Sequence, residues 1–395
     1  MKSKSIVSIV SCLLGIIISP ILLKAKNKEG VFDQEIIHVL RPVITKQSKW
    51  AMKQKPLTVT AYRAVRSTGG MHDFYSEGDY WWPDPKDPAA PYIQRDGMSN
   101  PANFVEHRKA MIRFSRIVGA LASAYRLNPD KKYVQQALRH LKAWFVDAET
   151  MMNPNLLYAQ AIAGRFTGRG IGIIDTIHLM EVAQGVKIFE NDPNFPASAK
   201  DAIHRWFAAY LRWLTTHQYG MDEMNAANNH GTCWVMQVAA FSSLVQDTLL
   251  LNKCADRYEH VLLPNQMESN GSFPRELQRT KPYGYSLFNL DAMTMICQIL
   301  SKANKSLWQY ALSDGRTIQK GVDFMIPYIA DKQKWPYQID VMYWEQWPIA
   351  HPALVFSAAA FQNKDYLQLW IDLDHDPQGD EVIRNLPIRN PLIWL

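Results

Sequence analysis

The sequence predicts an all-α protein, an (α/α) toroid or incomplete barrel of helical hairpins. From about residue 104 onward, apolar residues recur at steps of three and four, and alternation typical of strands is scarce. Short polar or proline-containing turns separate the periodic stretches, which favours stacked helix pairs. The pairs resemble one another too little for a regular repeat. We therefore expect an irregular toroid of about five to seven hairpins, within a single domain over residues 26–395.

The expected helices follow one another along the chain. One apolar face runs from Ala110 to Tyr125, and Asn128-Pro129-Asp130 then interrupts the pattern. The next helices are expected over residues 133–145, 174–189, 203–214, 232–251, 287–303, 316–330 and 350–362.

The segment Ser67–Asn100 differs from the rest of the chain. It is dense in Gly, Pro, acidic and aromatic residues and has no helical period. Long irregular stretches in compact proteins are usually functional or disordered. Because this one carries so many large aromatic side chains, we expect an ordered lid loop over a cleft.

The N-terminus has the pattern of an export signal. Lys2 and Lys4 precede an apolar stretch over residues 6–23, and Ala25 is a plausible last residue before cleavage. We expect residues 1–25 to be removed and the mature protein to be periplasmic or secreted, without stable membrane insertion. An uncleaved anchor and lipidation of Cys12 remain alternatives.

Composition limits the possible partners. The formal net charge of +6 favours polyanions, but the chain has no long Lys/Arg run and no nucleic-acid-binding signature, so nucleic acid is not expected. The 13 Trp and 17 Tyr suit either sugar rings or a helical core. Cys233, Cys254 and Cys297 are too few and too widely spaced for a disulfide framework, so we expect them to be buried. The sequence does not indicate an oligomeric state.

Two further segments carry groups suited to chemistry. In Asn225–Trp234, Asn228, Asn229 and His230 stand together before an expected helix. One Asn could simply cap that helix. A side-chain amide can also donate to a carboxylate, and a histidine can exchange a proton near neutral pH.

The other segment, Asn270–Asn289, contains Arg275, Arg279, Tyr283 and Tyr285. Arg279 could simply pair with Glu276 on a helical turn. An Arg beside a Tyr would also favour phenolate and lower the pKa of that Tyr from about 10. Together the two segments suit abstraction of H5 from a uronate, which needs a base, a neutralised carboxylate and an acid for O4.

Three motifs resemble a known family. They are Asn228-Asn229-His230, the Gly271-to-Ser286 stretch with Gly-Ser-Phe-Pro-x-Glu-Leu-x-Arg-Thr and Tyr-Ser, and the aromatic loop from Gly69 to Pro83. Together they resemble the alginate lyase superfamily of (α/α)-toroid polysaccharide lyases, in its branch of alginate and glucuronan lyases. The resemblance spans roughly residues 67–343. It implies β-elimination of 1,4-linked uronic acid polymers, alginate being favoured and glucuronan possible.

The resemblance also implies roles for individual residues. Asn229 would bind and neutralise the substrate carboxylate, and His230 would be the neighbouring neutralising or proton-transfer group. Arg279 would support the carboxylate and the phenolate, and Tyr285 would be base and acid for mannuronate or glucuronate. For guluronate His230 would be the base and Tyr285 the acid, and Tyr283 competes for the Tyr role. The residues expected to bind substrate are Asn228, His72, Tyr75, Tyr80, Trp81, Trp82, Arg275 and Tyr283.

Two other functions remain open. An inverting glycoside hydrolase would need a carboxylate pair, which Glu77, Asp79, Asp222 and Glu223 could supply. A non-catalytic glycan-binding lipoprotein would also suit the export signal and the aromatics. No metal or cofactor is expected, because we interpret Asp372, Asp374, His375 and Asp376 as a solvated acidic turn in a surface tail.

Overall fold

The computed structural model of the chain describes residues 31–302 and 305–395. The expected export signal and Cys12 lie outside these residues. Within the described residues, no helix combines the length and apolar character that a membrane span requires. Cys233, Cys254 and Cys297 are free and buried, as predicted.

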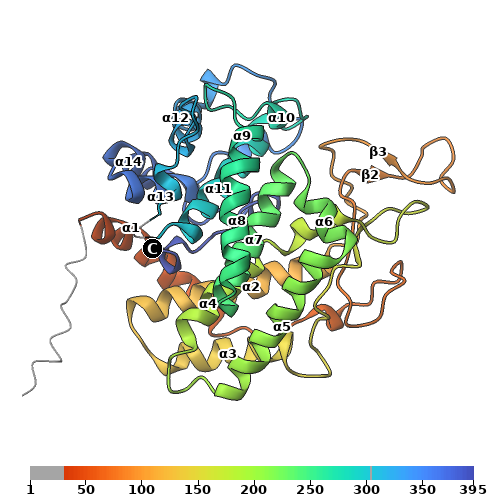
Figure 1. Cartoon of the computed structure of the whole chain (residues 1–395). Helices are drawn as coiled ribbons and strands as arrows, with labels where there is room; N and C mark the ends of the chain where they lie inside the picture. Colours follow the sequence, from red (N-terminus) through yellow and green to blue (C-terminus); the bar gives the residue numbers. More distant parts are fainter. Residues whose placement is uncertain (1–30, 303–304) are drawn as a thin grey trace, which may run out of the picture.

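Five helices form an inner layer in which each packs against the next (Figure 1). Their side chains are buried on nearly every side, which is why α7 and α11 are apolar all round rather than along one stripe. These helices are α2 (Glu106–Leu127), α4 (Leu179–Phe189), α7 (Asn229–Val245), α11 (Pro282–Leu300) and α13 (Pro352–Phe361).

A second helix follows each inner helix and covers the outside. The outer helices bury one face and expose the other, as amphipathic helices do. The resulting five pairs in the described part of the chain confirm the predicted all-α toroid. The outer helices are α3 (Lys131–Phe145), α5 (Ala197–Thr216), α8 (Thr248–Arg257), α12 (Ile318–Ala330) and α14 (Lys364–Ile371).

The helices differ from expectation at several places. The helix expected over 232–251 is broken at Gln246, which has a left-handed φ of 62°, and Asp247 then caps the first turn of α8. An additional helix, α1 (Val31–Ala51), packs on α2 through Ile36, Leu40 and Ile44, whose spacing of four residues marks one helix face.

Shorter elements connect the pairs. The short α-helices are α6 (Gln218–Met224), α9 (Leu263–Gln266), α10 (Pro274–Leu277) and α15 (Asp380–Arg384). The 3-10 helices are Val59–Ala61, Gly170–Thr176, Leu307–Gln309, Lys332–Lys334, Trp344–Gln346 and Pro391–Ile393, and a π-helical turn spans Tyr258–Leu262.

The aromatic segment 67–100 is an ordered loop without a helix. Its strand β1 (Tyr75–Glu77) pairs in parallel with β4 (Tyr158–Ala161), which ties the loop to the toroid. Strands β2 (Trp81–Trp82) and β3 (Ile93–Gln94) form a small antiparallel ribbon that projects to one side of the molecule (Figure 1).

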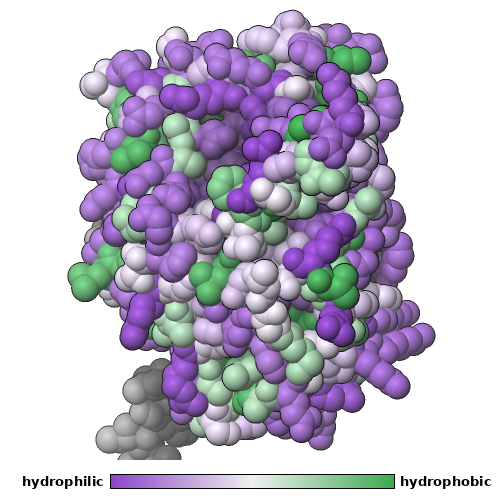
Figure 2. All heavy atoms as spheres, turned by 90° about the vertical axis from the view of Figure 1, so that its right-hand side faces the viewer, coloured by the Kyte–Doolittle hydropathy of each residue, from purple (hydrophilic) through white to green (hydrophobic). Residues whose placement is uncertain are grey.

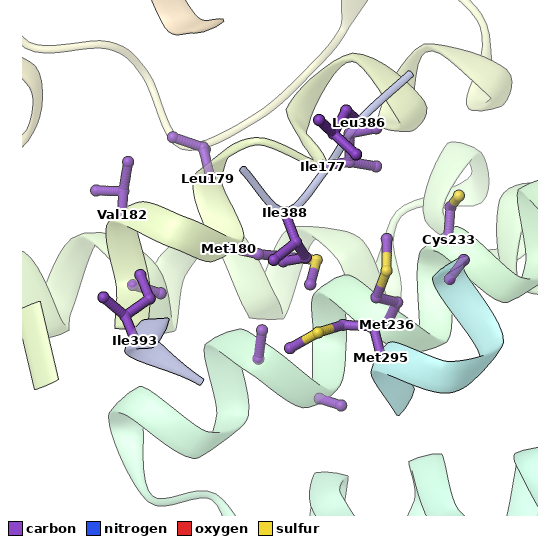
Figure 3. Packing of buried hydrophobic residues seen from close by; sticks show 14 of the residues in the cluster. Ile177, Leu179, Met180, Val182, Cys233, Met236, Met295, Leu386, Ile388 and Ile393 are labelled. Carbon is purple, nitrogen blue, oxygen red and sulfur yellow. The ribbon is translucent and has the colours of Figure 1, made fainter. Parts of the chain in front are cut away.

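The C-terminal segment is part of the core, and the expectation of a surface tail is wrong. Figure 3 shows Leu386, Ile388 and Ile393 in one apolar cluster with Met180 of α4 and Met236 of α7. The burial of these apolar side chains draws the segment from α15 onward across the toroid.

The acidic turn is likewise paired rather than simply solvated. Asp376 contacts Lys46 at 2.8 Å and Arg389 at 3.2 Å, and the Asp374 carbonyl accepts a hydrogen bond from the backbone of Ala350. These contacts, together with the apolar cluster, place Arg384 and Asn385 beside the cavity described next.

Candidate active site

A cavity of about 120 Å³ opens where inner helices α7 and α11 begin. The side of the molecule that carries β2 and β3 is largely hydrophilic, with small scattered apolar patches (Figure 2). The cavity is lined by Asp79, Tyr80, Trp81, Gln94, Asp96, Gln160, Arg169, Ile171, Ile174, Asn229, His230, Arg279, Tyr285, Phe288, Arg384 and Asn385.

The first residues of α7 are fixed by a buried carboxylate. Glu276 accepts hydrogen bonds from the backbone N–H of Asn229 and from its Nδ2, both at 2.7 Å. Burial raises the pKa of Glu276, and the bonds from Asn229 oppose that rise. The side-chain amide of Asn229 is therefore held in one orientation at the cavity wall, beside the partial positive charge of a helix N-terminus.

His230 is held by a second buried carboxylate. Its Nδ1 lies 2.7 Å from Oε1 of Glu223, and because a carboxylate only accepts, Nδ1 carries the proton. Burial acts to lower the pKa of His230, but the negative charge and hydrogen bond of Glu223 outweigh it and the pKa is raised. Nε2 is the ring nitrogen left for a ligand.

Tyr285 lies in the first turn of α11, with its hydroxyl 2.6 Å from that of Tyr80. Arg279 donates to the Tyr285 hydroxyl at 3.3 Å and stacks over its ring at 4.4 Å, while Asp96 accepts from Arg279 at 2.9 Å. Lys281 forms an ion pair with Glu381 at 2.6 Å, and its ammonium group also lies over the Tyr285 ring.

Arg279 acts to lower the pKa of Tyr285, as expected, but the expected net fall below the ordinary value does not occur in the free protein. Burial and the neighbouring Tyr80 raise the pKa of Tyr285 well above its usual value, and the opposing effect of Arg279 is smaller. Since Arg279 shares its charge with Asp96, Tyr285 is a phenol at neutral pH.

Asn229, His230, Arg279, Tyr285, Tyr80 and Trp81 thus meet in one cavity, but the other residues predicted to bind substrate do not line it. Tyr283 is fully buried, and its hydroxyl donates to the Tyr328 carbonyl at 3.0 Å. It therefore cannot replace Tyr285. Arg275 is exposed outside the cavity. Asn228 precedes α7 and contributes its backbone carbonyl to Gln266.

Three residues of the aromatic loop also lie elsewhere. His72 Nδ1 is 2.7 Å from the Met151 carbonyl, a structural contact away from the cavity. Tyr75 faces a separate hollow of about 510 Å³, and its hydroxyl donates to Glu77 at 2.8 Å. Trp82 donates to the Met98 carbonyl at 2.9 Å.

Two arginine side chains that the sequence did not indicate as site residues also line the cavity. Arg384 reaches it from α15 and pairs with Asp79, and Arg169 reaches it from the turn before Gly170–Thr176. The apolar residues before and after Arg384 in the sequence could have indicated that its segment is buried. Arg169 had no comparable signal, because it lies between two glycines outside any periodic stretch.

The carboxylates proposed for a hydrolase are poorly placed for acid catalysis. Of the four, Asp79 lines the cavity, and although burial opposes the effect, Arg108 and Arg384 lower its pKa well below the usual range. An inverting hydrolase needs an acid with a raised pKa in that position.

Comparisons with known proteins agree with this fold. The family model described as alginate lyase matches residues 58–335. An alginate lyase structure from Bacteroides ovatus is 30% identical, covers 91% of this chain and 93% of its own, and has a TM-score of 0.78.

More distant solved structures share the fold. Alginate lyase A1-III from Sphingomonas species A1 is 14% identical over 82% of this chain and 89% of its own, with a TM-score of 0.53. A histidine-to-alanine variant of A1-III complexed with a tetrasaccharide is 14% identical over 85% and 95%, with a TM-score of 0.55. The search of curated proteins gives no significant match. The family match covers most of the chain, and the protein therefore belongs to the alginate lyase family and is a polysaccharide lyase.

Proposed function

We propose that the protein cleaves 1,4-linked uronic acid polymers by β-elimination, with alginate as the favoured substrate and glucuronan as a second. The observation that carries the proposal is the convergence of Asn229, His230 and Tyr285 on one cavity from the adjacent starts of α7 and α11. The family match and the alginate lyase from Bacteroides ovatus support alginate.

In this mechanism the substrate carboxylate is neutralised at the start of α7. The Asn229 amide donates to one carboxylate oxygen, and the protonated imidazole of His230 donates through Nε2. Glu223 favours that protonated form, because its charge raises the pKa of His230. Neutralising the carboxylate makes H5 more acidic, since the dianion formed on its removal is otherwise unstable.

Tyr285 then transfers the protons. Because Tyr285 is a phenol in the free protein, its hydroxyl first loses its proton to water. The phenolate then removes H5, the C4–O4 bond breaks as the C4–C5 double bond forms, and the new phenol protonates the departing O4, which leaves Tyr285 as phenolate again. One residue serves both steps in mannuronate and glucuronate, where H5 and O4 lie on the same ring face. Hydrogen bonds from Arg279 and Tyr80 stabilise the phenolate. For guluronate, neutral His230 is the base on the opposite face and Tyr285 is the acid.

We further propose, from the pattern of residues 1–25, that the chain is exported and acts in the periplasm or outside the cell. Extracellular polymers are then accessible to it.

The purified protein should be incubated with poly-mannuronate, poly-guluronate and glucuronan, following near-ultraviolet absorbance and reducing ends together. A lyase produces both signals in parallel, because each cleavage leaves a C4–C5 double bond. A hydrolase produces reducing ends alone, and a glycan-binding protein produces neither. Either of the last two results on all three polymers contradicts the proposal.

A further inference from the structure

Arg169 differs from the other two arginines of the cavity because it forms no ion pair with a carboxylate of the described residues. Arg279 is paired with Asp96, and Arg384 with Asp79. Asp79, Asp175 and Glu223 act on Arg169 through space, but each is bound to another side chain.

Arg169 keeps its positive charge although it is partly buried. Burial lowers its pKa to about 10, so the guanidinium remains protonated at neutral pH. A partly buried cation without a counter-ion is stabilised when an anion pairs with it. The cavity wall at Arg169 is therefore suited to an anionic ligand group.

The surrounding residues orient the guanidinium. Its Nε donates to the Gln160 carbonyl at 2.8 Å, and Gln160 holds a left-handed φ of 53°, a conformation that non-glycine residues rarely adopt. A Cβ added at Gly78 would lie 3.0 Å from the Arg169 guanidinium and 2.6 Å from the Trp81 ring, so only glycine leaves room for both. The guanidinium lies 5.8 Å from the centre of that ring.

We propose that Arg169 and Trp81 form a second carboxylate-binding subsite, which takes the uronate unit next to the one being cleaved. The inference rests on the proposed uronan lyase function, in which Asn229 and His230 bind the carboxylate of the reacting unit. Every unit of a polyuronate carries one carboxylate. The unit next to the reacting one can therefore place its carboxylate against the guanidinium of Arg169. Arg169 binds that carboxylate through its free N–H groups, and Trp81 supports the sugar ring.

The test compares Arg169→Gln with Arg165→Gln. Arg165 is the matched control, because it also lies over the Trp81 ring, at 5.4 Å, but is exposed and outside the cavity. The substrate is whichever of the three polymers the wild-type protein cleaves fastest, and kcat and KM are measured at low and at high salt. For Arg169→Gln we expect KM to rise by about tenfold or more, kcat to change less than about threefold, and KM to become less sensitive to salt.

Arg165→Gln should leave KM within about twofold of the wild-type value, since surface charges contribute little. Arg169→Lys keeps the charge but loses the planar fork, so its KM should rise by an intermediate factor, and it decides the question if Arg169→Gln does not fold. An unchanged KM in the folded Arg169 variants, or an equal rise in Arg165→Gln, overturns the subsite. If the wild-type protein cleaves none of the polymers, the proposed function itself fails, which is a separate result.

Discussion

Replacing Glu223 with glutamine removes the negative charge that raises the pKa of His230. The Glu223 carboxylate is buried and lies 2.7 Å from Nδ1 of His230, whose side chain is 19% exposed. Glutamine has the same shape and can still accept a hydrogen bond from Nδ1. The substitution therefore isolates the charge of Glu223 from its packing.

The size of the effect follows from the geometry. Opposite charges about 4 Å apart attract by about 4 kcal/mol at an effective dielectric constant of about 20, and one pKa unit corresponds to about 1.4 kcal/mol. The full charge effect therefore corresponds to about three pKa units. Since the His230 side chain is 19% exposed and part of the hydrogen bond survives in the variant, we expect the pKa of His230 to fall by about one to two units. Burial then dominates, which takes the pKa of His230 below its ordinary value.

The assay is an NMR titration of the His230 ring together with the pH profile of kcat/KM. If imidazolium neutralises the carboxylate, the alkaline limb moves to lower pH and kcat/KM above the new pKa falls by about ten- to a hundredfold. If neutral His230 acts as base instead, the acidic limb moves to lower pH. Glu190→Gln is the control, because it breaks a similar contact at 2.7 Å with His204, away from the cavity. An unmoved His230 titration or an unmoved profile refutes the reasoning.

Two stability predictions concern the segment that carries Arg384. Ile388→Ala opens a cavity at a residue that is 2% exposed, so the free energy of unfolding should fall by about 2–5 kcal/mol in denaturant titrations, and a loss below about 0.5 kcal/mol contradicts the packing. Nε2 of His178 lies 3.0 Å from the carbonyl oxygen of Arg384 in that segment. Burial lowers the pKa of His178 to about 3, so its contribution to stability is present above about pH 6.5 and is lost as the pH falls toward 3. Because glutamine does not titrate, the stability of the wild-type protein relative to His178→Gln should fall by about 2 kcal/mol between pH 6.5 and pH 5, and parallel pH dependences of the two proteins would disprove this.

The helical pattern predicted the toroid because inner and outer helices leave different apolar patterns in the sequence. It did not predict the break at Gln246, since glutamine is not a residue that usually signals a left-handed turn. Nor did it place the start of α11, which was expected at residue 287 and lies at Pro282. Proline at the first helical position was the available signal.

That boundary decides which tyrosine belongs to the site. Tyr283 and Tyr285 are two positions apart on one helix, and at about 100° per residue they point to opposite sides. Had the helix been predicted to begin at Pro282, the sequence alone would have placed Tyr283 and Tyr285 on opposite faces of it. The contact between Arg384 and Asp79 joins residues 305 positions apart, and no local pattern encodes such a distant pair.

The most direct test of Tyr285 as the proton-transfer residue compares Tyr285→Phe with Tyr283→Phe in the near-ultraviolet assay. Each variant loses one hydroxyl from the same helix, but only the Tyr285 hydroxyl reaches the cavity. We predict that Tyr285→Phe lowers kcat by about a hundredfold or more while oligosaccharide affinity stays within a few-fold, and that Tyr283→Phe keeps kcat within about threefold of the wild-type value. Wild-type turnover in Tyr285→Phe would contradict the mechanism.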